Sequence, residues 1–214
     1  MISTVIFDLD GLLTDTDRLH CKAYRQTLAE AGVSLTEAEY AEHWIRKGLG
    51  IADLVHARGL SLDPQELRRR KSQLYLVLLE TWLEFRPGAL VLLQRLRGHK
   101  RMALASSARS DAVQGVLKRL NISYYFEVVA TERDVAHVKP HPDIFFHVAQ
   151  RMGVSPAECL VLEDAEKGVL AACAAGMKVI AVPQPLTQNN DFSKATRVLR
   201  SLEEVTTALI DSLG

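Results

Sequence analysis

Two aspartates near the N-terminus stand at a spacing that suits phosphoryl-transfer chemistry. The stretch "VIFDLDGLLTDT" begins as an apolar run and places Asp8 and Asp10 two residues apart, so that in an extended strand both side chains face the same way. One carboxylate can attack phosphorus, and the other can protonate the leaving alcohol and then deprotonate water. The alternative is a pair that ends a strand and caps a turn, but the full D-x-D-G-x-x-x-D-T string favours the catalytic interpretation.

Further candidate residues follow apolar runs later in the chain. Ser106 and Ser107 come after "MALA", where a hydroxyl and nearby backbone N–H groups can hold phosphate oxygens, although serines are also ordinary turn residues. Lys139 precedes a proline in "HVKPHPD", which indicates an extended or turn segment. A fixed ammonium there could balance the nucleophile and the transferring group, but the residue also fits a solvated surface lysine.

An acidic pair completes the set of candidates. Glu163 and Asp164 end the apolar run "CLVL", and acidic residues there could simply cap the next helix. If these carboxylates converge with Asp8 and Asp10, their repulsion is relieved most simply by a hard cation. Mg²⁺ fits such oxygen ligands, and the sequence offers no sulfur or clustered histidine ligands for zinc. We therefore expect a magnesium site at Asp8, Asp10, Glu163 and Asp164.

Short apolar runs rich in branched residues recur and alternate, later in the chain, with helical patterns. This alternation predicts an α/β fold with a Rossmann-like parallel sheet that is covered by helices on both faces. In such sheets ligands bind outside the carboxyl ends of the strands, and Asp8, Ser106 and the acidic pair each fall at such an end. The expected strands are "TVIFDLD", "RMALASS", "EVVAT", "CLVLED" and "KVIAVP".

Residues 17–84 interrupt this alternation, because they carry helical patterns with no convincing strand between them. We interpret them as an inserted helical cap domain, and we assign residues 1–16 and 85–214 to the α/β catalytic core domain. A helical lid over the strand ends would exclude water during reaction. The alternative is that these helices simply pack on the sheet. Trp44 and Trp82 are expected in the core of the lid.

Composition and charge exclude several classes of partner. The 214 residues are 48% hydrophobic, which is enough for one core domain with an insertion. The 26 basic and 26 acidic side chains cancel, so we expect no nucleic-acid partner. The N-terminal apolar run is too short for a signal peptide or a membrane span. Three widely spaced cysteines suit a reduced compartment, and we predict a cytoplasmic protein with no membrane partner.

In chain order, "DLDGLLTDT", "LASS", "VKPHPDIF" and "LEDAEKGVLAACAAGM" resemble the motifs of the haloacid dehalogenase-like (HAD) superfamily, over essentially the whole chain. The resemblance implies that Asp8 is the nucleophile and Asp10 the acid and base, with the backbone carbonyl of Asp10 also on the metal. It further implies that Asp164 holds Mg²⁺ and that Glu163 acts on the metal directly or through water.

The same resemblance assigns the substrate contacts. Ser106 would bind phosphate, with Ser107 beside it, and Lys139 would steady the phosphate and the nucleophile. The cap position resembles the subgroup with a helical cap after the first strand, which includes β-phosphoglucomutases and sugar-phosphate phosphatases. Three cap residues match the mutases and are candidates for substrate binding: His20, Lys47 and Lys71.

One departure separates the chain from the mutases. A mutase must grip a second phosphate from the cap, for which arginine is the natural group, and in mutases that arginine follows a "KGVS"-like loop. Here the loop reads "RKGLGIADL", and Ile51 occupies the matching place, which favours a hydrolase. Val138 and His141 replace small residues that often flank the lysine–proline pair, and they could reshape the entrance.

We therefore expect a Mg²⁺-dependent phosphatase that works through an aspartyl-phosphate on Asp8. Its substrate would be a small phosphorylated metabolite, with a sugar phosphate as the first candidate, and its assembly a monomer or weak dimer. The alternatives are a β-phosphoglucomutase-like phosphosugar mutase, a dehalogenase that uses the same aspartate on carbon, and a non-catalytic domain that senses a ligand. Asp10 and the acidic pair argue against the dehalogenase, and the full set of catalytic groups argues against the sensor.

Overall fold

A six-stranded parallel sheet forms the centre of the larger part of the molecule, in a computed structural model that describes residues 1–214. The strand order is β3-β2-β1-β4-β5-β6. β1 is central, and its Phe7 is in register with Leu104 of β2 and with Leu162 of β4. The strands are β1 (Thr4–Phe7), β2 (Arg101–Ala105), β3 (Val128–Ala130), β4 (Cys159–Glu163), β5 (Lys178–Ala181) and β6 (Arg197–Val198).

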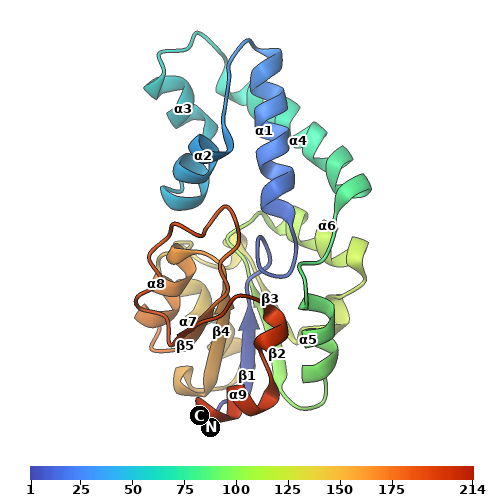
Figure 1. The fold of residues 1–214 in the computed structure, drawn as a ribbon, viewed down its shortest axis with the longest axis vertical. Coiled ribbons are helices and arrows are strands. Elements are labelled where there is room, and N and C mark those ends of the chain that lie inside the picture. The colour runs from blue at the N-terminus through green and yellow to red at the C-terminus, as the bar shows by residue number, and fades with distance from the viewer.

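Alternating side chains of the strands divide the core into two hydrophobic clusters, one on each face of the sheet. Val5 and Phe7 pack with α5, α6 and α9, whereas Ile6 packs with α7 and α8. Figure 1 shows these helices around the sheet. The predicted parallel sheet with helices on both faces is confirmed. The helices are α5 (Ala89–Leu96), α6 (Ser110–Leu120), α7 (Asp143–Met152), α8 (Glu166–Ala174) and α9 (Thr207–Ser212).

A second group of helices stands beyond one end of the sheet (Figure 1), and we call it the helical cap. Its members are α1 (Thr16–Glu30), α2 (Glu37–Tyr40), the π-helical segment η1 (Ala41–Arg46), α3 (Ile51–Ala57) and α4 (Pro64–Trp82). α1 packs along α4, and the distal part of the cap has its own hydrophobic cluster around Leu28, Tyr40 and Leu54. No helix of the protein has both the length and the apolar run that crossing a bilayer requires.

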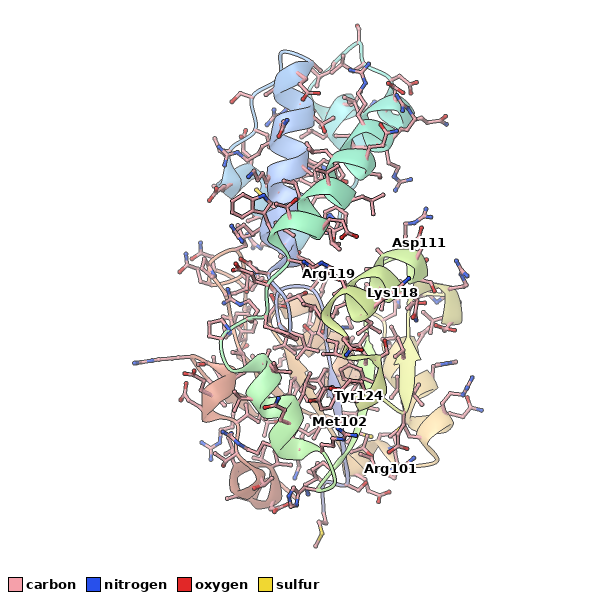
Figure 2. All side chains as sticks on the ribbon, turned by 90° about the vertical axis from the view of Figure 1, so that its right-hand side faces the viewer. Arg101, Met102, Asp111, Lys118, Arg119 and Tyr124 are labelled. Atoms are coloured by element: carbon pink, nitrogen blue, oxygen red, sulfur yellow. The ribbon has the colours of Figure 1, made fainter.

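Local signals explain where the longest cap helix begins. Pro64 occupies the first turn of α4, where a missing N–H costs nothing. The side chain of Asp63 accepts a hydrogen bond from the backbone N–H of Gln65 at 2.9 Å and so caps the helix. The C-terminal end of α4 contacts the core. Arg119 of α6, labelled in Figure 2, donates to the backbone carbonyl of Glu80 at 3.2 Å.

The chain crosses between sheet and cap twice, and the two crossings lie side by side. Thr14 and Phe85 form an antiparallel bridge, and the backbone N–H of Arg86 donates to the carbonyl of Leu13 at 2.9 Å. The borders predicted at residues 16/17 and 84/85 fall next to this paired segment. The division of the chain into two domains at those residues stays a prediction.

Two neighbouring phenylalanines on α7 test the packing against the sheet. Phe145 is fully buried, whereas Phe146 is 46% exposed. We expect Phe145→Ala to lower the free energy of unfolding by about 3–5 kcal/mol, because it removes a buried ring and leaves a cavity. Phe146→Ala should change it by no more than about 1 kcal/mol. Urea denaturation followed by circular dichroism measures both, and equal losses would contradict the described orientation of α7.

Candidate active site

The carboxyl ends of three neighbouring strands bring the predicted chemistry into one cavity of about 370 Å³. Asp8 follows β1, Ser106 follows β2 and Asp164 follows β4. Because β1 lies between the other two strands, these side chains meet at one edge of the sheet. The lining contains every predicted site residue except Lys47: Asp8, Asp10, His20, Lys71, Ser106, Ser107, Lys139, Glu163 and Asp164.

The ammonium of Lys139 is enclosed by three acceptors. Its Nζ donates to Asp8 Oδ1 at 2.6 Å, to the carbonyl oxygen of Ala105 at 2.8 Å and to Glu163 Oε1 at 2.5 Å. Burial by itself lowers the pKa of Lys139, but the charges of Asp8 and Glu163 outweigh burial and raise the pKa above its ordinary value. The lysine therefore stays charged and orients Asp8, and its three N–H groups are all in use.

Both carboxylate oxygens of Glu163 are engaged inside the protein. Oε1 accepts from Lys139, while Oε2 accepts from the backbone N–H groups of Asp164 at 3.1 Å and Ala165 at 3.4 Å. Burial raises the pKa of Glu163 to about 7, although Lys139 acts in the opposite direction. This arrangement suits a residue that holds Lys139 and the start of the following loop in place.

Two hydroxyl groups hold Asp10. Thr16 Oγ1 donates to Oδ1 at 2.5 Å, and Ser106 Oγ donates to Oδ2 at 3.2 Å. Burial, and then the charge of Asp8, raises the pKa of Asp10, while the two hydroxyl bonds offset part of this rise. A carboxyl group that keeps its proton to a higher pH is suited to protonate a leaving alcohol. Thr16 lies within the N-terminal motif, but the sequence alone did not assign it a role.

The loop after β2 presents two serines to the cavity. Ser106 Oγ accepts a hydrogen bond from the backbone N–H of Ala108 at 3.0 Å and so is fixed toward Asp10. Ser107 Oγ is buried and has no hydrogen-bond partner in the protein. Because an unpaired buried hydroxyl costs free energy, an incoming anion that accepts from it would be bound favourably.

Asp17 and Gln184 belong to the site but were not found from the sequence. Gln184 Nε2 donates to Asp17 Oδ2 at 3.3 Å and to Asp164 Oδ2 at 3.4 Å. Burial, and then the charge of Asp10, raises the pKa of Asp17 to about 7. Asp17 lies three residues before His20 on α1, a spacing that places both on one helix face and could have identified it. Gln184 comes three residues after the end of β5, the same separation as that of Asp10 from the end of β1.

The acidic residues fit a divalent cation. Asp8, Glu163 and Asp164 each place a carboxylate oxygen within 4.8 Å of the others. Burial raises the pKa of Asp164 well above its ordinary value, and the charges of Asp17, Asp8 and Glu163 add to the rise. A hard cation relieves this repulsion, and an oxygen-only donor set suits Mg²⁺.

The half-buried His20 and the buried Lys71 form a pair on the cap side of the cavity. Lys71 Nζ lies 2.5 Å from His20 Nδ1 and 4.6 Å and 4.8 Å from the ring centroids of Tyr24 and Tyr75. Burial lowers the pKa of Lys71 to about 8, although Asp10 opposes the change. Burial, and then the charge of Lys71, lowers the pKa of His20 well below its ordinary value. Both groups face the cavity, and their contact with substrate stays a prediction.

Lys47 and Ile51 lie outside this cavity. The side chain of Lys47 is 56% exposed and pairs with Glu42 at 3.2 Å, and it lines a neighbouring cavity that does not include Asp8. Ile51, which occupies the place of the mutase arginine, is buried in the cap cluster.

The structure also places the two tryptophans of the cap and the two residues that depart from the family pattern. Trp44 packs against the cap cluster and also lines the catalytic cavity. Trp82 is half exposed beneath the ammonium of Lys22, so the prediction that it lies in the lid core is wrong. Val138 and His141 are exposed and do not line the cavity.

Comparison with known proteins identifies the family of the chain. Residues 2–176 match the model of the haloacid dehalogenase-like hydrolases, and the chain belongs to this family. It is 35% identical over 184 residues to fructose-1-phosphate phosphatase YqaB of Escherichia coli. The aligned region covers 83% of this chain and 95% of that protein. The resemblance drawn from the motifs is thereby confirmed.

Solved structures show the same fold. CbbY from Rhodobacter sphaeroides, in complex with phosphate, superposes with a TM-score of 0.84 at 29% identity, covering 99% of this chain and 100% of that one. A putative β-phosphoglucomutase from Thermotoga maritima superposes with a TM-score of 0.79 at 26% identity, covering 98% and 99%. Both likenesses include the cap as well as the sheet.

A pair of glycine variants tests the confinement of Glu163. A Cβ at Gly168 of α8 would overlap the Glu163 carboxyl group, whereas Gly115 of α6 has open space around it. We expect Gly168→Ala to lower the free energy of unfolding by about 1–3 kcal/mol through overpacking. Gly115→Ala should raise it by up to about 1 kcal/mol, because alanine favours helix. Chemical denaturation measures both, and a Gly168→Ala variant as stable as the parent would contradict the contact.

Lys71 allows a test that depends on pH. Its pKa of about 8 lies below the ordinary value of 10.5, so folding disfavours the charged form. This cost, about 3 kcal/mol, is complete below pH 8, falls between pH 8 and 10.5, and vanishes above that range. We therefore expect Lys71→Met to raise the free energy of unfolding by up to about 3 kcal/mol at pH 7 and by much less at pH 10.5.

Urea denaturation at the two pH values measures this difference. Lys47→Met is the matched control, because its ammonium is exposed, and it should change stability by less than about 1 kcal/mol at both. A Lys71→Met variant that is less stable than the parent at pH 7 would show that the buried ammonium does not lower the free energy of unfolding.

Proposed function

We propose that this protein is a Mg²⁺-dependent phosphatase that hydrolyses the phosphate ester of a small metabolite, with sugar phosphates as the substrate class. The pairing of Asp8 with Lys139 beside Asp10, in a cavity whose carboxylates suit a hard cation, carries the proposal. The similarity to a protein named fructose-1-phosphate phosphatase supports the substrate class. We expect it to act in the cytoplasm, as a monomer or weak dimer, without a nucleic-acid partner.

In the first step, Asp8 attacks the phosphorus atom. Lys139 occupies Asp8 Oδ1, which leaves Oδ2 for the attack. A bond forms between Oδ2 and phosphorus, the bond from phosphorus to the leaving oxygen breaks, and Asp10 gives its proton to that oxygen. The alcohol departs, Asp8 carries the phosphoryl group, and Asp10 is left as a carboxylate.

In the second step, water attacks the phosphoryl group on Asp8. Asp10 takes a proton from the water, an oxygen–phosphorus bond forms, and the bond between phosphorus and Asp8 Oδ2 breaks. Inorganic phosphate leaves, and both aspartates return to their starting state. The hydrogen bond from Thr16 stabilises the charged Asp10 that this step requires.

Asp8, Asp164 and the backbone carbonyl of Asp10 would hold the cation. When bound, Mg²⁺ supplies positive charge that offsets the repulsion between the attacking carboxylate and the phosphate oxygens. Glu163 would support the metal through water and by fixing Lys139, because both of its oxygens already accept hydrogen bonds from the protein.

The phosphate oxygens would be bound by Ser107 and Lys139, and by Ser106 once its single O–H group turns from Asp10 Oδ2 to the phosphate. Ser107 Oγ is buried beside the cavity without a partner, so it can donate to a phosphate oxygen. Lys139 already donates three hydrogen bonds, so its contact with phosphate requires that one of its present acceptors, such as the Ala105 carbonyl, be exchanged.

The alcohol part of the substrate would lie against the cap. His20 and Lys71 offer polar contacts there, and Trp44 offers an apolar wall. Lys47 would reach only a substrate that extends into the neighbouring cavity.

A phosphosugar mutase is the second candidate, because the fold is similar to a putative β-phosphoglucomutase. The buried Ile51 provides no group that could bind a second phosphate at the mutase position, which favours hydrolysis.

Asp8→Asn tests the nucleophile. The amide has the size of the carboxylate but does not attack phosphorus, so Mg²⁺-dependent phosphate release from an aryl phosphate should fall by roughly 10⁴-fold or more. Asp211→Asn is the matched control, because Asp211 lies on α9 and pairs with Lys100, away from the cavity. It should leave the rate unchanged.

Retained full activity in Asp8→Asn would refute the mechanism. Interconversion of sugar phosphates after priming with a bisphosphate, in place of phosphate release, would identify a mutase. A release assay over fructose 1-phosphate, other sugar phosphates, phosphoglycolate and nucleotides would define the substrate.

A further inference from the structure

Gln184 is a buried neutral side chain placed between two site carboxylates. It lies in the loop that follows β5 and is 4% exposed. Figure 1 shows this loop rising from the sheet toward the cap. The two hydrogen bonds from its Nε2 join Asp164, at the end of β4, to Asp17, at the start of the first cap helix.

The remaining atoms of Gln184 are fixed by its own loop. Its Oε1 accepts the backbone N–H of Leu186 at 3.1 Å. Its backbone N–H donates to Oγ1 of the fully buried Thr187 at 3.0 Å. Leu186 in turn packs against the hydrophobic cluster of the cap. The amide therefore has one orientation, with its N–H₂ group toward the carboxylates.

Gly11 explains why the two carboxylates can approach so closely. It has φ of +87°, and a Cβ at this position would collide with the carboxylate oxygens of both Asp164 and Asp17. The space that a side chain would fill is thus occupied by the two acids, and Gln184 donates to both from the loop side. A neutral donor can hold carboxylates in place without neutralising them, whereas a lysine would compete with a bound cation.

We propose that Gln184 is a positioning residue that holds Asp164 in the orientation needed to bind the divalent cation and ties it to Asp17 at the base of the cap. This inference rests on the proposed function, because it assumes that Asp164 is a metal ligand. Groups that orient metal ligands typically contribute 10–100-fold in metal affinity.

Gln184→Met keeps the length of the side chain and removes both donors. We expect its dissociation constant for Mg²⁺, measured by calorimetry on the full chain without substrate, to rise about 10-fold or more. The Mg²⁺ concentration for half-maximal phosphate release should rise by the same factor, while kcat at saturating Mg²⁺ changes much less. Gln188→Met is the matched control, because Gln188 is exposed in the same loop, and it should bind Mg²⁺ like the parent.

Parental Mg²⁺ affinity in a folded Gln184→Met variant overturns the inference, and so does a loss of kcat without a change in affinity. If Gln184→Met does not fold, Gln184→Asn, which withdraws the amide by about 1.5 Å, must still bind Mg²⁺ more weakly than the parent, and equal affinity overturns the inference. A parent protein that binds no Mg²⁺ would overturn the proposed function itself, so the two failures are distinguishable.

Discussion

The ammonium of Lys139 sits among Asp8, Glu163 and a backbone carbonyl at the edge of the sheet, and the acidic site depends on this cluster. Asp10, Asp17 and Asp164 stand close by, and burial and mutual repulsion raise their pKa values. Lys71 and Lys167 also line the cavity, but with Lys139 they are three ammonium groups against five acidic side chains. The remaining negative charge is what makes a divalent cation, and then a phosphate held through it, the fitting occupants of the cavity.

The hydrophobic sheet creates this costly arrangement by fixing where the strands end. Because β1 runs between β2 and β4, every residue that follows one of these strands is carried to the same edge, whatever its charge. The two apolar clusters on the faces of the sheet hold the strands in register. Local features then place individual groups. Ser106 fixes Asp10 by a hydrogen bond, and the missing side chain of Gly168 leaves room for the Glu163 carboxyl group.

The core and its acidic residues were predictable because each depends on short-range patterns. Apolar runs identify strands, and a polar residue at the end of a run lies at the sheet edge, as Asp8, Ser106 and Asp164 do. The positions of the cap side chains were harder to predict, because helical spacing does not determine which face of a helix points toward the cavity. Lys47 was expected near substrate but pairs with Glu42, and Trp82 was expected inside but is exposed. Asp17 was missed although it shares a helix face with His20, and Gln184 was missed because its contacts join distant segments.

The bridge between Thr14 and Phe85 keeps the entry and exit of the cap adjacent. A segment whose two ends meet at one point can be exchanged for another of different length without rethreading the strands. An exchange of the cap helices that keeps the chain up to Asp17 would leave Asp10 and its partner Thr16 in place, while it replaces the cap side chains that line the cavity. New specificities could therefore arise in a single genetic event.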